Sequence, residues 1–151
     1  MALTNTSPNT ILLDVGSDSK LLEAPSVDAG DIYPGALLEY DDNGNFQLST
    51  PVGAGEPFPI IIAIENTAEG MGLTDPYETG DKVYAVHLRS GDLFQGILHD
   101  SGAHVFGLPV GTSSQAGRFT STTITIANSV VLMGENKTFA TGGLLAKLIV
   151  K

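Results

Sequence analysis

Short apolar runs separated by turn-forming residues dominate the sequence. Most of these runs are about four to eight residues long and are bounded by Gly, Pro, Asn or Asp, and none keeps a helical period for three turns. Val, Ile and Thr together are twice as common as Lys, Arg, Glu and Gln together, a balance that favours strands. The pattern therefore predicts an all-β protein.

The clearest predicted hairpin joins residues 82–89 to residues 93–99 through the turn Ser90-Gly91-Asp92. Both alternating faces of residues 82–89 are mostly apolar, which predicts a strand that is covered on both sides. A second hairpin is predicted between residues 36–40 and 46–49, because the Asn-Gly pair in the intervening Asp42-Asn43-Gly44-Asn45 readily forms a type I′ turn.

Three further runs predict strands with different degrees of burial. Residues 59–64 are almost continuously apolar, as expected of a strand between two layers, whereas residues 120–126 partly alternate and are expected to be half exposed. Residues 144–150 are expected to form a terminal strand entered through Gly142-Gly143. A short helix also suits their period, but the two glycines and the β-branched end favour the strand.

The polar N-terminus precedes the first apolar cluster, which begins at Ile11. We expect an N-terminal arm over residues 1–10, with an extension to residue 30 left open, followed by a single β domain over residues 11–151. The arm is either a frayed terminus or a segment that becomes ordered on a partner. No signal peptide is expected at the start, and no run is long enough to cross a membrane as a helix.

The charge of the chain is negative and unevenly distributed. The net charge is −10, with seven Lys and Arg against seventeen Asp and Glu. Residues 1–80 hold thirteen of the acids and one base, while residues 81–151 hold four acids and six bases. Nucleic-acid binding is disfavoured because it needs clustered cations. Cysteine is absent, which excludes disulfides, thiolate metal sites and cysteine nucleophiles.

Two kinds of loop motif resemble known binding loops but lack residues that those loops need. Residues 41–45 have the oxygen-rich look of a calcium loop, but the sixth and twelfth positions counted from Asp41 are Phe46 and Val52, so a hairpin turn is the better interpretation. The glycine pairs at 53–55 and 70–72 lack the remaining residues of a nucleotide-binding fingerprint. No cofactor is expected.

The histidines are the remaining candidates for chemistry. His87, His99 and His104 are the only three in the chain, and Asp100 lies between the last two, so a metal site is conceivable. A hydrolase triad of Ser101, His104 and Asp100 is equally conceivable, but the chain has no nucleophile-elbow motif. We favour hydrogen-bonded structural histidines, and no catalytic or metal site is expected.

Three motifs occur in an order that resembles a known family. They are DAGDIYPGALLEY at residues 28–40, IIIAIE at 60–65 and YETGDKVY at 77–84, followed by a glycine-rich tail. This arrangement resembles the head decoration, or cement, proteins of tailed bacteriophages. The resemblance covers roughly residues 28–110 and more loosely the end of the chain.

The resemblance implies a fold, a function and a set of partners. The expected fold is a compact β-barrel, jelly-roll or β-tulip-like domain with an extended N-terminal arm. The expected function is a non-enzymatic virion protein that binds the outside of an icosahedral capsid and bridges neighbouring copies of the major capsid protein, as a homotrimer and without nucleic acid or membrane. The apolar residues near the arm are candidate capsid contacts: Leu3, Pro8, Ile11, Leu12 and Leu13. The alternatives are a carbohydrate- or receptor-binding module and a small hydrolase that uses His99, His104 and Asp100.

Overall fold

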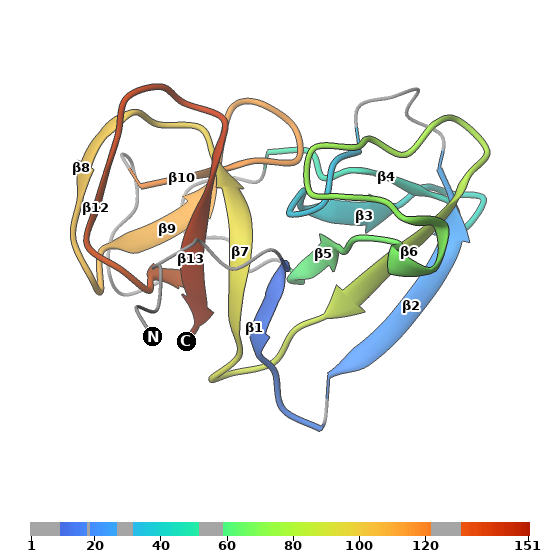
Figure 1. Cartoon of the computed structure of the whole chain (residues 1–151), viewed down its shortest axis with the longest axis horizontal. Coiled ribbons are helices and arrows are strands. Elements are labelled where there is room, and N and C mark those ends of the chain that lie inside the picture. The colour runs from blue at the N-terminus through green and yellow to red at the C-terminus, as the bar shows by residue number, and fades with distance from the viewer. Residues whose placement is uncertain (1–9, 18, 27–31, 52–58, 122–130) are drawn as a thin grey trace, which may run out of the picture.

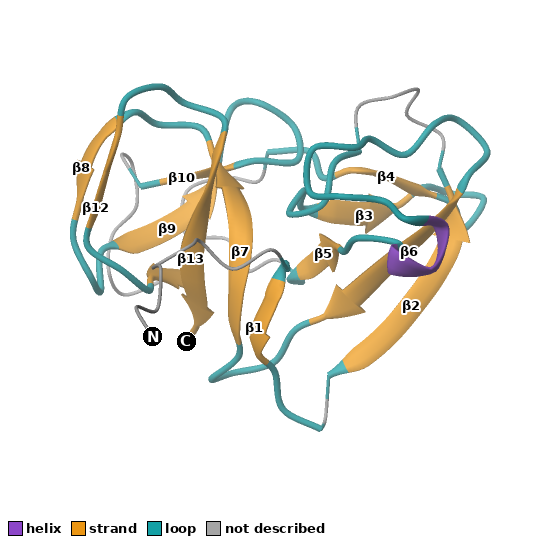
Figure 2. Ribbon diagram, viewed as in Figure 1, coloured by secondary structure: helices purple, strands orange, loops and turns teal. Residues whose placement is uncertain are grey.

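The protein consists of two β lobes that lie side by side (Figure 1). The computed structural model describes residues 10–17, 19–26, 32–51, 59–121 and 131–151. Strands and connecting loops make up nearly all of these residues, and the single short helix is the 3-10 turn η1 at Thr67–Glu69 (Figure 2). The predicted all-β class is thus confirmed. No helix in the described part of the chain is long and apolar enough to cross a membrane.

The first lobe is a closed barrel of five strands with one additional strand on its side. The barrel strands run β7, β10, β9, β11, β13 and back to β7, and β1 pairs with the start of β7. All neighbours are antiparallel except β10 and β7, which are parallel. A separate ribbon of β8 and β12 extends from this lobe. The strands are β1 (Leu12–Asp14), β7 (Leu93–Leu98), β8 (Gly102–His104), β9 (Pro109–Thr112), β10 (Phe119–Thr120), β11 (Val131–Met133), β12 (Lys137–Phe139) and β13 (Leu144–Val150).

Alternating side chains fill the barrel. On β13, Ala146, Leu148 and Val150 are buried while the residues between them are partly exposed. Gly96 on β7 makes this packing possible, because a Cβ there would lie 2.7 Å from the ring of Phe119 and 2.8 Å from the side chain of Leu148. The expected terminal strand over residues 144–150 is confirmed.

The second lobe contains a three-stranded sheet and a hairpin. The sheet has the order β2 (Lys20–Pro25), β6 (Lys82–His87), β5 (Ile61–Ala63), and the hairpin pairs β3 (Leu38–Tyr40) with β4 (Phe46–Leu48). A second apolar cluster lies between them, built around Ile32, Phe46, Ile61, Tyr77 and Val83.

The sheet of the second lobe separates the two clusters. On β5, Ile61 and Ala63 belong to the cluster of the second lobe, whereas Ile62 belongs to the cluster of the barrel. On β6, Val83 and Val86 divide in the same way. Within residues 59–64 the structure has the predicted strand between two layers only at Ile61–Ala63. The prediction that residues 82–89 are covered on both sides is confirmed.

The predicted hairpin between residues 82–89 and 93–99 is wrong. β6 pairs with β2 and β5, and β7 pairs with β1, β10 and β13, so the two strands belong to different sheets. Residues 90–92 form a corner instead, where Gly91 N–H donates to the carbonyl of Val150 over 2.8 Å and Val150 N–H donates to that of Asp92 over 3.0 Å. Each strand pairs with strands from elsewhere in the chain, and a turn motif alone does not show whether the two strands beside it pair with each other.

A buried carboxylate holds this corner to the start of the chain. Asp92 accepts hydrogen bonds from Gly16 N–H over 2.8 Å, from Arg89 N–H over 2.7 Å and from the Ser19 hydroxyl. Burial by itself raises the pKa of Asp92, but the three hydrogen bonds outweigh it and the pKa is lowered. Asp92 thus connects the β1–β2 loop to the β6–β7 corner.

The second predicted hairpin is confirmed, but its turn type is not. Gly44 has a φ of 81° and no other residue type in the described chain has a positive φ, whereas a type I′ turn needs two left-handed residues. Gly44 N–H donates to the carbonyl of Asp41 over 3.1 Å, which closes a tight turn followed by a left-handed glycine. The Asp41 carboxylate accepts the N–H groups of Asn43 and Asn45 over 2.9 and 2.8 Å and makes this form favourable.

The region assigned to the N-terminal arm lies partly outside the described residues. Residues 1–9 are not described. The extension of the arm to residue 30 does not agree with the structure, because Lys20–Pro25 is strand β2 and all six of its residues pair with β6. Residues 122–130, which include most of the run expected to be a half-exposed strand, also lie outside the described part; β10 covers its first residue, Thr120.

Candidate functional site

Three of the five predicted contact residues lie in the described part of the chain. Leu3 and Pro8 lie outside the described residues. Ile11 is fully buried in the barrel cluster, so it serves the core of this chain and not an exposed arm. Leu12 and Leu13 are partly buried on β1. The described part of the predicted set therefore does not form a continuous exposed surface.

The structure brings Asp100 and His104 near a serine that the sequence did not single out. His104 Nδ1 lies 3.0 Å from the hydroxyl oxygen of Ser121. Asp100 accepts hydrogen bonds from Ser121 N–H and from the Thr120 hydroxyl, both over 2.7 Å. Ser101, the serine considered from the sequence, is exposed. Ser121 lies 21 residues from Asp100 in the sequence, and only the barrel topology brings the two together.

The order of these contacts differs from that of a hydrolase triad. In a triad the histidine lies between the nucleophile and an orienting carboxylate. Here Ser121 lies between the other two, since its hydroxyl is 3.4 Å from Asp100 Oδ2. His104 is buried, its ring meets Phe139 edge-on at 5.6 Å, and no described residue is a hydrogen-bond partner for its Nε2. The contacts attach β8 to the end of β10 and bring no carboxylate to the imidazole.

The other histidines do not gather around this cluster as metal ligands. His87 is half-buried on β6, and its pKa is lowered by burial and by the positive charges of Arg89 and Lys20. His99 follows β7, and its Nδ1 is buried without a described partner. Within the described ranges, no group of three or more His, Asp or Glu side chains is arranged to hold a metal ion.

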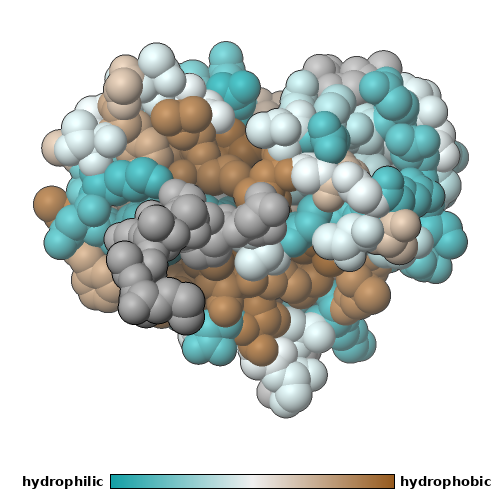
Figure 3. All heavy atoms as spheres, in the orientation of Figure 1, coloured by the Kyte–Doolittle hydropathy of each residue, from teal (hydrophilic) through white to brown (hydrophobic). Residues whose placement is uncertain are grey.

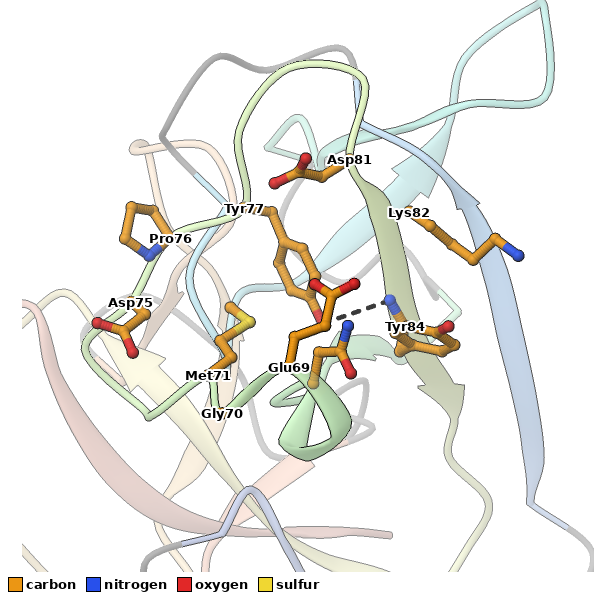
Figure 4. Close-up of a pocket in the computed structure, with 10 residues that line it drawn as sticks. Glu69, Gly70, Met71, Asp75, Pro76, Tyr77, Asp81, Lys82 and Tyr84 are labelled. Atoms are coloured by element: carbon orange, nitrogen blue, oxygen red, sulfur yellow. Dashed lines mark hydrogen bonds between the residues drawn. The ribbon is translucent and has the colours of Figure 1, made fainter.

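A polar hollow opens beside Tyr77 in the second lobe (Figure 4). Its volume is about 520 Å³, and it lies between η1, the 70–77 loop and the start of β6. The Tyr77 hydroxyl donates to the carbonyl of Ile64 over 2.6 Å and accepts from Tyr84 N–H over 3.5 Å. Burial, opposed by the bond from Tyr84, raises the pKa of Tyr77 to about 12. The rim carries Asn66, Glu69, Met71, Asp75, Asp81 and Lys82.

Tyr77 is also where the three sequence motifs meet. Ile32 forms an isolated β-bridge with Tyr77, and Leu37 forms another with Ile62. Gly35 N–H donates to the carbonyl of Ala63 over 2.8 Å. The described parts of residues 28–40, 60–65 and 77–84 thus form one hydrogen-bonded framework, which the order of motifs along the chain could not reveal.

Comparison of the chain with models of known protein families and with curated proteins found no match.

Proposed function

We propose that this protein is a non-enzymatic decoration protein that binds the outer surface of an icosahedral phage capsid and bridges neighbouring major capsid subunits. One observation carries the proposal: the three motifs that resemble the decoration-protein family come together as the framework of the second lobe. The three motifs occur in the family's order and also contact one another in one lobe. A shared fold explains both facts more simply than three independent chance matches do.

Two further properties support a binding role. The described contacts of Ser121, His104 and Asp100 do not have the order that nucleophilic catalysis needs. The chain also exposes large apolar side chains on the barrel lobe, among them Leu144. Leu144 lines an apolar hollow together with Ile97 and Leu145, and contiguous exposed apolar surface is typical of protein contact sites.

A decoration protein stabilises a shell because it binds the assembled form and not the separate subunits. At a free concentration one hundred times the Kd, each occupied site adds about 2.7 kcal/mol to the stability of the assembled state. Residues 1–80 hold thirteen acids and one base, so this part of the chain has the charge to bind a basic patch on such a shell. As a homotrimer, the protein would match local three-fold positions of the shell.

The experiment uses undecorated, expanded phage heads assembled from a major capsid protein. We expect saturable co-sedimentation of the full chain with these heads, a rise in the melting temperature of the shell, and weaker binding as NaCl is raised. Light scattering should give the mass of a trimer. If the heads neither bind the protein nor melt at a higher temperature, the proposal is refuted.

A second candidate, a carbohydrate- or receptor-binding module, is favoured by the polar hollow beside Tyr77. Its rim offers carboxylates, an amide and tyrosines, groups that suit a hydroxyl-rich ligand. A glycan array probed with the purified chain tests it. Binding that is lost in Asp75→Ala, while head binding is retained, would assign this hollow to sugars.

A further inference from the structure

An apolar groove lies on the barrel face at the start of β13, toward the second lobe. It consists of two adjoining hollows of about 480 and 270 Å³, which share Leu73, Leu144 and Leu145. We call it the Leu144 groove. Figure 3 shows hydrophobic residues gathered over the upper part of the barrel beside the second lobe. The other apolar lining residues include Tyr33, Pro34, Ile97 and Phe139.

The charged side chains that line this groove are both basic. They are Arg118 in one hollow and Lys137 in the other, and neither lining includes an Asp or Glu. This is notable in a chain in which acids outnumber bases seventeen to seven. The Lys137 ammonium already lies 5.1 Å from the centre of the Phe139 ring, where the cation contacts the π face.

Arg118 lies where a ligand carboxylate could reach it. The side chain is half-buried and passes over Gly143, where a Cβ would lie 3.0 Å from Nη1. Among the described residues, the one ion pair is Lys82 with Glu23, and neither of these residues lines the groove. A guanidinium beside apolar walls, with no ion-pair partner among the described residues, is well suited to pair with a carboxylate in two parallel hydrogen bonds.

We propose that the Leu144 groove is a docking site for an extended peptide segment of a partner protein that carries a carboxylate next to a large apolar side chain. The carboxylate pairs with Arg118, and the apolar side chain contacts Leu144 and Leu145. Charge complementarity determines this choice, because the charged side chains that line the groove, Arg118 and Lys137, are both basic. The identification of the partner as the major capsid protein rests on the proposed function. The chemistry of the docking segment is inferred from the groove alone.

Peptides test the chemistry directly. The probe is a synthetic acetyl-Ser-Leu-Asp-Phe-Ser-amide, titrated into the ¹⁵N-labelled full chain and followed by amide chemical shifts. We expect shifts at Arg118, Gly143 and Leu144, and an at least fivefold loss of affinity when the peptide Asp is replaced by Asn. Absence of shifts at the groove, or equal affinity for the Asn peptide, would overturn the proposal.

Variants of the protein test the same groove with heads. Arg118→Glu and Leu144→Ser change the groove, and Arg89→Glu and Leu21→Ser are matched controls at exposed positions outside it. We expect the groove variants to bind the peptide and the undecorated heads at least tenfold more weakly, and the controls to stay within twofold of the original chain. Circular dichroism confirms that each variant is folded.

The two proposals fail in different ways. If the original chain and all four variants bind heads equally, the groove is not the docking site, although the protein still decorates capsids. If no chain binds heads, the proposed function fails, and the peptide titration alone decides the groove. If the mass in solution falls only in the groove variants, the groove is an interface between copies of this chain and the docking proposal is wrong.

Discussion

Replacing Asp92 by Asn should destabilise the fold strongly, because this carboxylate joins two segments that are distant in the sequence. It accepts three hydrogen bonds, from Gly16, Ser19 and Arg89, at a position that is 4% exposed. One hydrogen bond to a charged group contributes about 1.5–3 kcal/mol. Asn keeps one acceptor oxygen and introduces a donor facing donors, so we expect a loss of about 3 kcal/mol, or a Tm lower by about 6–12 °C.

The lowered pKa of Asp92 also predicts how its contribution to stability changes with pH. The pKa of Asp92 is lowered in the folded state, so the ionised carboxylate adds stability above the unfolded pKa of about 3.9. That contribution is lost as the pH falls through the lower folded value. The difference between the original chain and Asp92→Asn should therefore be full at pH 7 and shrink below about pH 4.

Urea unfolding followed by circular dichroism at pH 7, 5 and 3 measures the difference. Asp42→Asn is the control, since Asp42 is an exposed turn residue on the β3–β4 hairpin. The control should stay within about 0.5 kcal/mol of the original chain. A loss below about 1 kcal/mol for Asp92→Asn, or a loss that is the same at pH 3 and pH 7, would refute the role assigned to this carboxylate.

Three other substitutions test the packing and the turns. Gly96→Ala should cost about 1–3 kcal/mol in urea unfolding, because the new methyl group would lie 2.7 Å from the Phe119 ring. Tyr77→Phe should cost about 1–2 kcal/mol by removing the hydroxyl that donates to Ile64. Since the pKa of Tyr77 is raised to about 12, the stability linked to its proton is present below about pH 10 and lost toward pH 12, a loss that the Phe variant should not show. Asp41→Ala should speed amide hydrogen exchange in the β3–β4 hairpin, because it removes the acceptor that holds the turn.

Controls for these three variants come from the same chain. Gly72→Ala places its methyl group 3.4 Å from the nearest atom and should have a much smaller effect than Gly96→Ala. Tyr40→Phe removes a hydroxyl from a tyrosine that is 46% exposed and should leave stability nearly unchanged. Equal effects at Gly72 and Gly96, or at Tyr40 and Tyr77, would contradict the packing described for the barrel and the second lobe. Unchanged exchange in Asp41→Ala would contradict the role of its carboxylate in the turn.

Local patterns in the sequence were sufficient for the class of fold and for several strands. Three elements were predicted correctly from local sequence. Burial on two faces gives the continuous apolar run within residues 59–64, and burial on one face gives the alternation of residues 144–150. The positive φ that the turn of the second hairpin needs favours the glycine of its Asn-Gly pair. The turn at residues 90–92 was also located correctly. What the pattern did not contain was the pairing of the strands on either side of it.

The sequence by itself determined that the chain forms strands, that its acids lie mostly in the first 80 residues, and that it lacks cysteine chemistry. Only the tertiary structure decided that β6 and β7 part into different sheets, that Ile11 enters the core, that Ser121 meets His104, and that Arg118 borders an apolar groove. The physical reason is that backbone preference and burial pattern act over a few neighbouring residues. Barrel closure and side-chain contacts depend instead on segments that are many residues apart, and their relative stability is settled only when the whole chain packs.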